Sequence, residues 1–473
     1  MLNLVEDAKT QRRKDAKTQS GNGALPCVVA SLRRSSYTTP ERKQSTPPLS
    51  SAVPSTPNGP APLPPKWNTA ETATDPRVGF LLALGRALHG AGHSSQGLEE
   101  LLELTAAKLG VPGEFFTTPT SIFAAFGHDE RQRTYLLRVE PEGPDLGRLA
   151  GIKTVLDQVL DGTVDPATGA ARLRAVAESR SPYSRVLTTA AFSLSSGASA
   201  AFFGGGPREI VLAAALGLVT GLLALVAERH PTLQRIFATV AAFVVALLAT
   251  VAGILLGNVS VSTAILGGLV VLLPGLMLVG AMGELASGHL SSGTARAAGA
   301  FIVFLGIGFG TALGTRVATG LELGATPVTQ PEGLPVHYIW VAIVAAALAF
   351  AVLLKADRRD IPWIVLGACV SILASRLGSL VVGPEMAPFF GSFGVAVAGW
   401  LFATRTSRPS SVVVAPGVLV LVPGSIGFRS IAALMDRSVV AGIDNAMSAL
   451  VTAIALVVGL LVANVVLPSR PDL

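Results

Sequence analysis

The chain of 473 residues is 50% hydrophobic and 14% charged, and its mean hydropathy is +0.57. With 50 glycines and only 6% aromatic residues, this composition excludes a soluble globular protein and is typical of a membrane protein with many closely packed helices. The net charge of +6 comes from basic residues in the N-terminal tail and in alternate loops, which indicates membrane orientation and argues against a nucleic-acid partner. Cys27 and Cys369 provide neither a disulfide framework nor a metal-binding spacing, so we expect no metal and no cofactor.

Residues 1–76 predict a disordered tail. They contain DAKTQRRK and DAKTQ in succession at 7–19, followed by a stretch rich in Ser, Thr and Pro. Such a segment has too little apolar surface to offset the entropy of an ordered chain. Its basic charge favours a cytoplasmic N-terminus.

Residues 77–184 predict a small cytoplasmic α+β domain with a regulatory or assembly role. Two helices come first, RVGFLLALGRALHGAG and the amphipathic LEELLELTAAKLG. Two strands are expected at FFTTPTSIFAAFG and RTYLLRVE, with the charged GHDER between them as a turn. Two further helices follow, and Asp165 with Pro166 begins the second of them.

A catalytic role for this domain is the alternative that its composition leaves open. Ser94 and Ser95 are more simply caps of a helix that begins near Gly97. The domain does hold the residue types of a hydrolase, but their spacing matches no nucleophile elbow, HExxH or CxxC motif. We therefore favour a domain without enzymatic activity, and the residues in question are His89, His93, Ser94, Ser95, His128 and Asp129.

From Arg185 onward, ten apolar segments predict ten membrane-spanning helices. The first five form one unit over 185–330 and the last five form a second over 331–473. The expected spans are 186–203, 209–227, 236–256, 262–283, 296–315, 337–354, 361–382, 388–404, 412–433 and 444–467.

Basic residues between the spans predict the orientation. With the N-terminus inside, the outside loops hold only Arg208, Arg316 and Arg437, with Arg429 close to that face. The inside loops and tail hold many more, which places both termini in the cytoplasm and the chain in the inner (plasma) membrane. These inside residues are Arg229, Arg235, Arg296, Lys355, Arg358, Arg359, Arg405, Arg408 and Arg470.

The fourth span, STAILGGLVVLLPGLMLVGAMG, carries Pro274 and Gly275 near its middle. Proline removes a backbone donor and glycine tolerates irregular dihedrals, so backbone groups are freed at membrane depth. Such groups persist only where they line protein or a wet cavity. GGLVVLLPG at 267–275 recurs 149 residues later as PGVLVLVPG at 416–424, which predicts a second broken helix at Pro423.

The repeat extends beyond the two breaks. REIVLAAALGLVTGLL at 208–223 aligns with RDIPWIVLGACVSILA at 359–374, and Gly293 aligns with Gly442. Because each repeat has five spans, the second copy crosses the membrane in the opposite sense. The expected fold is an all-α polytopic membrane protein, a 5+5 inverted repeat with broken helices, preceded by the small α+β domain.

Several blocks of the chain resemble the threonine/serine exporter family. They are GRALHGAGHSSQGLEELLELTAAKLG, FFTTPTSIFAAFG, FGGGPREI, PGLMLVGAMGELASGHLSSGTARAAGA and LVPGSIGFRSIAAL, and the overall pattern covers residues 77–467. The resemblance implies a ten-span inner-membrane permease that exports L-threonine and L-serine and is driven by the proton motive force. The family often has aspartate where Glu284 stands, so a carboxylate is kept at that position.

A hydroxy amino acid needs donors for its carboxylate, acceptors for its ammonium group and a partner for its hydroxyl. The half-helices after the two prolines would present the amides of Leu276 and Ser425 to the carboxylate, and unwound carbonyls would receive the ammonium group. Ser425 would also contact the hydroxyl. Prolines that only kink packed helices are the alternative. The substrate-binding candidates are Pro274, Gly275, Leu276, Pro423, Gly424 and Ser425.

Charged residues in or beside the spans are candidates for gating or proton transfer, because burying a charge in a membrane is costly. Glu284 lies ten residues after Pro274, about 15 Å along a helix, and so near the cytoplasmic face. Arg376 lies well inside its span and is expected to face a cavity or a carboxylate. The gating candidates are Glu284, Arg296, Arg376, Asp436 and Asp444, and the carboxylates considered for Arg376 are Glu385, Asp436 and Asp444.

These patterns together predict a secondary transporter that exports small hydroxy amino acids by proton antiport. The expected partners are an amino-acid substrate and the lipid bilayer, and the formation of a homo-oligomer is left open. Another small-solute permease, a passive channel or anchor, and a membrane-tethered hydrolase acting through residues 77–180 are the alternatives.

Overall fold

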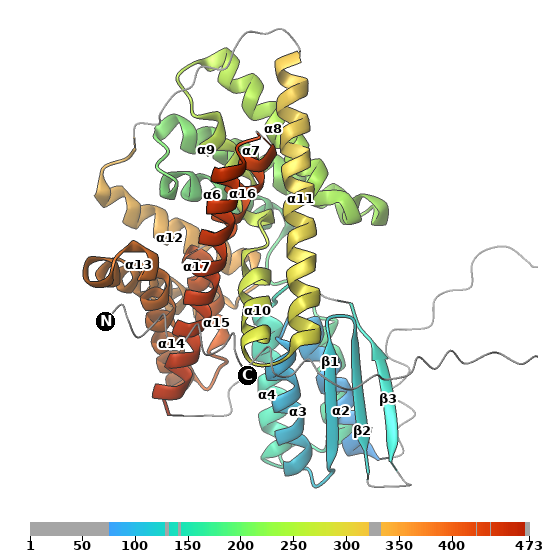
Figure 1. Cartoon of the computed structure of the whole chain (residues 1–473). Coiled ribbons are helices and arrows are strands. Elements are labelled where there is room, and N and C mark those ends of the chain that lie inside the picture. Colours follow the sequence, from blue (N-terminus) through green and yellow to red (C-terminus); the bar gives the residue numbers. More distant parts are fainter. Residues whose placement is uncertain are drawn as a thin grey trace, which may run out of the picture. The chain divides into compact units, whose positions relative to one another are not determined.

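The computed structural model describes residues 75–127, 132–140, 143–320, 333–421, 423–435 and 437–468. A small α+β domain comes first in the chain, and a long series of apolar helices follows it (Figure 1).

The N-terminal domain consists of four helices and three strands. The helices begin where an aspartate or serine side chain accepts a hydrogen bond from the first turn, as Asp165 does from the Thr168 N–H. Pro166 follows Asp165 at the first helical position, as predicted. In chain order the elements are α2 (Pro76–Gly90), α3 (Ser95–Lys108), β1 (Gly113–Thr118), β2 (Ser121–Phe126), β3 (Arg133–Arg138), α4 (Leu146–Leu160) and α5 (Pro166–Ala177).

The three strands form an antiparallel sheet in the order β1-β2-β3. The prediction of a single strand over 115–127 was wrong, because the chain turns back between Thr118 and Ser121. Pro119 cannot donate to a strand ladder, and the Thr118 hydroxyl contacts the Ser121 hydroxyl across the turn at 2.7 Å. The charged segment predicted as the only turn has residues 128–131 outside the described part of the chain.

One face of the sheet is buried against the helices of the domain. Ile122 and Leu137 are 1% and 2% exposed, and they pack in the same core as Phe80, Leu98 and Ile152. This core, built from alternate residues of each strand, fixes α3 and β1 relative to one another. The N-terminus of α3 is thereby held as a rigid feature of the domain.

The remaining elements are helices, most of them apolar. They are α6 (Arg185–Phe202), α7 (Pro207–Ala227), α8 (Pro231–Leu256), α9 (Val261–Leu269), η2 (Val270–Leu272), α10 (Gly275–Ala286), α11 (Leu290–Gly320), α12 (Val336–Leu353), η3 (Arg358–Asp360), α13 (Ile361–Val382), η4 (Pro384–Met386), α14 (Ala387–Thr406), α15 (Ser411–Leu421), α16 (Pro423–Met435) and α17 (Val439–Val466).

Seven helices in the described part of the chain are long and apolar enough to cross a membrane, and the bent pair α9 and α10 raises the number to eight. The expected ten spans would also need α6 and α12. The Ser-rich α6 is less apolar than the seven helices, and the apolar part of α12, His337–Leu353, is shorter than they are. The chain is therefore a multi-pass membrane protein, and the ten-span arrangement stays a prediction.

Helix packing follows the same pattern in the two halves of the membrane region. In the first half α7 packs on α9, α8 on α11, and α10 on α11. In the second half α13 packs on α15, α14 on α17, and α16 on α17. Between the halves, α6 packs on α12, and α10 contacts α15, α16 and α17.

Candidate functional site

The fourth predicted span is broken at Pro274, as the sequence predicts. Helix α9 runs into the short 3-10 turn η2, and α10 begins after Pro274 at an angle of 58° to the preceding helix. Leu273 is extended, and the Gly275 N–H bonds back to the Leu273 carbonyl at 2.8 Å. The regular backbone ladder is interrupted here because proline supplies no N–H.

Gly275 lies directly against Gly424, its counterpart in the repeat. A side-chain carbon added at Gly275 would lie 3.5 Å from the Gly424 nitrogen, and one added at Gly424 would lie 3.1 Å from the Cβ of Leu273. Pro423 begins α16, and Ser425, two positions later, is 7% exposed. The two proline-glycine segments therefore meet at one crossing. Unlike α9 and α10, helices α15 and α16 form one apolar span over Ser411–Met435 without a sharp bend. Val422, between them, lies outside the described residues.

The space beside this crossing is small and apolar. A cavity of about 10 Å³ is lined by Gly275 and Leu276 of α10, by Phe350 of α12, and by Val418 and Leu419 of α15. Such a volume holds about one water molecule, far less than an amino acid. The crossing is thus closed in this conformation.

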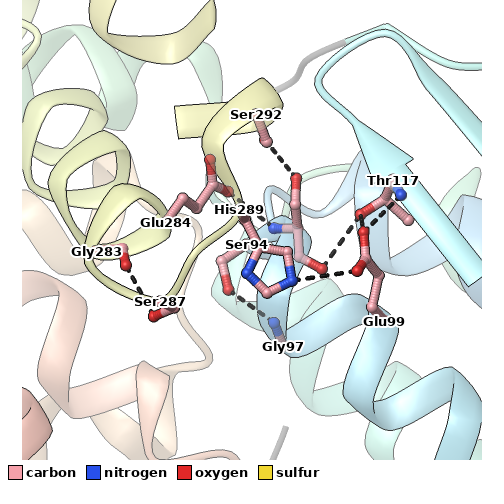
Figure 2. Close-up of polar contacts among 10 residues, drawn as sticks. Ser94, Gly97, Glu99, Thr117, Gly283, Glu284, Ser287, His289 and Ser292 are labelled. Carbon is pink, nitrogen blue, oxygen red and sulfur yellow. Dashed lines mark hydrogen bonds and ion pairs between the residues drawn. The ribbon is translucent and has the colours of Figure 1, made fainter. Parts of the chain in front are cut away.

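A second group of polar residues lies where the N-terminal domain meets the loop between α10 and α11 (Figure 2). Glu284, near the end of α10, is 2% exposed, and its Oε1 accepts a hydrogen bond of 2.9 Å from the Ser95 N–H. The Arg296 Nε of α11 lies 3.1 Å from the same oxygen. Glu284 is therefore compensated by one cation and by the N-terminus of α3, which favours a negative charge.

Two further contacts join the same elements, and Figure 2 draws them beside Glu284. The hydroxyls of Ser95 and Ser292 are 2.6 Å apart, and both residues are buried. The His289 Nε2 lies 3.1 Å from Glu99 Oε2, while Glu99 Oε1 accepts from the N–H and hydroxyl of Thr117. Helices α10 and α11 pack together and, with the loop between them, form what we call the membrane hairpin. We call the contact of Ser95 and Glu99 with Glu284, His289 and Ser292 the hairpin contact.

Two histidines lie on the domain side of the hairpin contact, and His89 is buried whereas His93 is half-buried. Burial, and after it the charge of Arg296, lowers the pKa of His89. The same two causes lower the pKa of His93 to about 4. The imidazole of His93 is therefore neutral at cellular pH.

The same domain is also joined to the loop between α12 and α13. The Leu146 and Gly147 N–H groups donate to the carbonyls of Leu354 and Lys355 at 2.9 and 3.1 Å. The Tyr183 hydroxyl donates to the Ala356 carbonyl at 2.6 Å. A side chain at Gly147 would lie 2.7 Å from the Lys355 carbonyl oxygen, so this contact has no room for one. The domain thus bridges the two halves of the membrane region.

Two family profiles match the chain. The ThrE threonine/serine exporter family matches residues 79–318, and the ThrE_2 threonine/serine exporter family matches residues 338–466. The chain belongs to the threonine/serine exporter family.

Curated relatives carry two different names. The "Probable threonine/serine exporter" of Mycobacterium tuberculosis is 27% identical over 355 residues, which are 72% of this chain and 66% of that protein. The "Pheromone-regulated membrane protein 10" of Eremothecium gossypii is 25% identical over 360 residues, 74% of this chain and 48% of that protein. Its namesake in Candida albicans is 26% identical over 384 residues, 78% of this chain and 34% of that protein. The chain thus spans less than two thirds of the length of these relatives, and no solved structure matches it.

Two other predicted gating residues of this exporter-family chain, Arg376 and Asp444, lie at neither site. Arg376 is exposed on α13, and its guanidinium lies 6.0 Å from the centre of the Trp340 ring. Within the described residues it forms no ion pair with Glu385 or Asp444, so the expected carboxylate partner was wrong for these two. Asp444 is exposed on α17, and Asp436 lies outside the described part of the chain.

Two candidate hydrolase residues of the exporter-family domain, Ser94 and Ser95, have structural partners. The Ser94 hydroxyl caps α3 by accepting from the Gly97 N–H, as predicted. The prediction that Ser95 is also a cap was wrong, because Ser95 is the first residue of the helix and bonds Glu284 and Ser292. His128 and Asp129 lie outside the described residues.

The sequence did not predict Ser95, Glu99, His289 and Ser292 as interacting residues. The signal available was indirect, since the positive-inside pattern places the domain and the loop between the fourth and fifth spans on the same side. This pattern predicts that the two regions lie on the same side of the membrane, but it does not predict which residues are in contact.

Proposed function

We propose that this exporter-family protein is a secondary transporter that moves L-threonine and L-serine out of the cell in exchange for protons. The observation that carries the proposal is the crossing of the two proline-glycine segments at Gly275 and Gly424. Transporters of inverted-repeat architecture hold substrate where such discontinuous helices meet. The match to threonine/serine exporters and the name of the mycobacterial relative support hydroxy amino acids as the substrate class.

The proposed substrate site consists of Pro274, Gly275 and Leu276 with Pro423, Gly424 and Ser425. The small cavity beside the crossing would widen when α10 moves relative to α15 and α16, because the three helices contact one another there. The start of α10 then offers backbone N–H groups to the substrate carboxylate. Ser425 is buried at the same level and is proposed to meet the substrate hydroxyl.

Transport of labelled L-threonine by purified protein in proteoliposomes tests this function. We expect accumulation that depends on an imposed pH gradient, with L-serine competing and L-alanine and L-proline competing weakly. Transport of threonine without any response to the pH gradient would contradict proton antiport. Transport of a different small solute with no transport of either hydroxy amino acid would favour another permease of the same fold.

We further propose that Glu284 takes part in proton coupling and that ten spans place both termini in the cytoplasm. The two loops that contact the domain, near Glu284 and Lys355, both lie on the inside in that topology. Glu284→Gln should retain threonine exchange but lose gradient-driven accumulation, because exchange needs no net proton movement. In a variant without Cys27 and Cys369, an impermeant thiol reagent applied to intact cells should label a cysteine at Gly324 and none at Thr232 or Ser407.

A further inference from the structure

The residue at the centre of the hairpin contact is itself a serine. The Ser95 N–H donates to Glu284 Oε1 at 2.9 Å, and the Ser95 hydroxyl lies 2.6 Å from the Ser292 hydroxyl (Figure 2). Ser95, Glu284 and Ser292 are 1%, 2% and 2% exposed. The membrane hairpin therefore binds the nitrogen and the hydroxyl of one serine residue in a site closed to solvent.

Free L-serine or L-threonine carries a nitrogen on Cα and a hydroxyl on Cβ, as Ser95 does. It also has additional N–H donors and a carboxylate, for which the membrane hairpin has partners. Within the described residues, Glu284 Oε2 is buried without a hydrogen-bond partner, whereas an ammonium group has three N–H donors in place of the single amide N–H of Ser95. Arg296, 3.1 Å from Glu284 Oε1, is a cation within reach of the amino acid's carboxylate. The carbonyl of Ser95 instead accepts from the hydroxyl of Thr117, inside its own domain.

We infer that Glu284, Arg296 and Ser292 form a binding site for zwitterionic amino acids with a β-hydroxyl group, and that Ser95 occupies this site as a tethered substitute for the free ligand. The inference rests on the proposed function for the class of ligand. It places this site near the end of α10, about 14 Å along the helix from the crossing at Gly275.

Occupancy of the site by free ligand has a mechanical consequence. The domain's other contact, with Leu354, Lys355 and Ala356, uses main-chain carbonyls, and it remains when Ser95 leaves the hairpin. When Ser95 is displaced and the Glu99–His289 contact opens with it, the first half of the membrane region is released from a domain that is still attached to the second half. A rise in cytoplasmic threonine or serine would thus free α10 to move, and the exporter would respond to its own substrate.

Hydrogen exchange on the full-length protein in nanodiscs tests the inference, with deuterium uptake measured in a peptide covering residues 94–99. Saturating L-threonine or L-serine should increase uptake at the start of α3, because the Ser95 N–H loses its bond to Glu284. L-valine, which has the shape of threonine without its hydroxyl, should have little effect at the same concentration. Unchanged uptake under conditions where the same preparation transports threonine would overturn the inference and leave the proposed function intact. Absence of threonine transport with a threonine-induced increase in uptake would overturn the proposed function and keep the binding site.

Two variants separate a ligand site from ordinary domain packing. Ser95→Ala removes the tethered hydroxyl, so free threonine meets weaker competition and its apparent KM should fall about two- to tenfold, the worth of one hydrogen bond. Ser292→Ala removes the partner of both hydroxyls, so the preference for threonine over valine at the start of α3 should be lost. Ser179→Ala, which deletes a hydroxyl bonded to Val176 within the domain, is the matched control and should change neither quantity. A KM that rises in Ser95→Ala, or a preference that survives Ser292→Ala, would contradict the inference.

Discussion

The two halves of the membrane region place corresponding residues in corresponding contacts. Gly310 of α11 lies against α8, where a Cβ would be 2.3 Å from the Thr239 carbonyl oxygen. Gly459 of α17, 149 residues later, lies against α14, where a Cβ would be 2.4 Å from the Phe389 carbonyl oxygen. Both contacts are steric and include a main-chain carbonyl, and at Gly459 the Ser392 hydroxyl lies closer still, so they depend on the close approach of two helices.

The charged residues of the two halves differ. Glu284 and Arg296 pair in the first half, whereas Ala433 and Asn445 occupy the positions 149 residues later. What the halves share therefore positions the crossing of the helices. The pair that they do not share, Glu284 and Arg296, lies at the face that contacts the N-terminal domain, and we assign the proposed regulation to that face.

At one further pair of corresponding positions, both halves have a buried carboxylate, but the group that compensates its charge differs. Glu209 at the start of α7 accepts from the Gly206 and Ser260 N–H groups at 2.9 and 2.8 Å. Asp360, 151 residues later at the start of α13, lies 3.0 Å from Arg408 instead. Both carboxylates are buried, at 3% and 2% exposure. A buried carboxylate is thus tolerated in each half once either helix N–H groups or a guanidinium compensates it.

The largest loss of stability is expected when Glu284, which has no charged counterpart in the second half, is replaced. Glu284→Ala makes the first half resemble the second and leaves Arg296 without its anion. Breaking a buried ion pair costs about 3–5 kcal/mol, and we expect the lower end because the side chain of Arg296 is 20% exposed. Thermal unfolding in detergent measures the loss. Asp444→Ala, at an exposed carboxylate of α17, is the control and should leave the unfolding temperature unchanged; equal losses would contradict the assignment.

The shared steric contacts predict an effect of equal size in both halves. Gly310→Ala and Gly459→Ala each force a methyl group against a backbone carbonyl, so each should destabilise the protein by about 1–3 kcal/mol. Gly280→Ala in α10 is the control, because nothing lies within 4 Å of its added methyl group. That variant should be neutral or slightly more stable, since alanine favours a helix. A loss in only one of the two halves would argue against their equivalence.

The two prolines should differ, although sequence symmetry alone predicts equal effects. Pro274 lies at a bend of 58°, whereas α15 and α16, on either side of Pro423, form one span without a sharp bend. Pro274→Ala would favour a continuous helix by about 3 kcal/mol of propensity and remove the bend, so threonine transport should fall sharply while insertion is retained. Pro423→Ala should reduce transport less. Parental transport rates in both variants would show that the prolines are structural kinks only.

Local chemistry explains what the sequence could predict. The break at Pro274 was predictable because proline and glycine act on the backbone at their own position, and Asp165 with Pro166 marks a helix start for the same reason. The hairpin at Pro119 was missed because the apolar pattern on both sides reads as one strand. The pairing of Ser95 with Glu284 spans 189 residues and depends on how two folded units dock, which no local pattern encodes.

The smallest effect concerns a pair of hydroxyls at corresponding positions. The Thr220 hydroxyl of α7 donates to the Gly268 carbonyl of α9 at 3.2 Å, and the Ser371 hydroxyl of α13 donates to the Gly417 carbonyl of α15 at 3.1 Å. Both hydroxyls are buried, and each carbonyl lies in the helix that precedes a proline-glycine segment. Thr220→Val and Ser371→Ala remove the hydroxyl at nearly constant volume, so each should cost about 1 kcal/mol of unfolding free energy.

The comparison of these two variants is sharper than either measurement alone. Thr319→Val is the matched control, because the Thr319 hydroxyl is exposed and, among the described residues, bonds only to carbonyls of its own helix. If the two halves hold their helix pairs by the same contact, the two losses should agree within about 0.5 kcal/mol and exceed that of the control. A loss confined to Thr220→Val would mean that the first half alone depends on this bond. The hydroxyl contact would then belong with the charges that distinguish the halves and not with the glycines that they share.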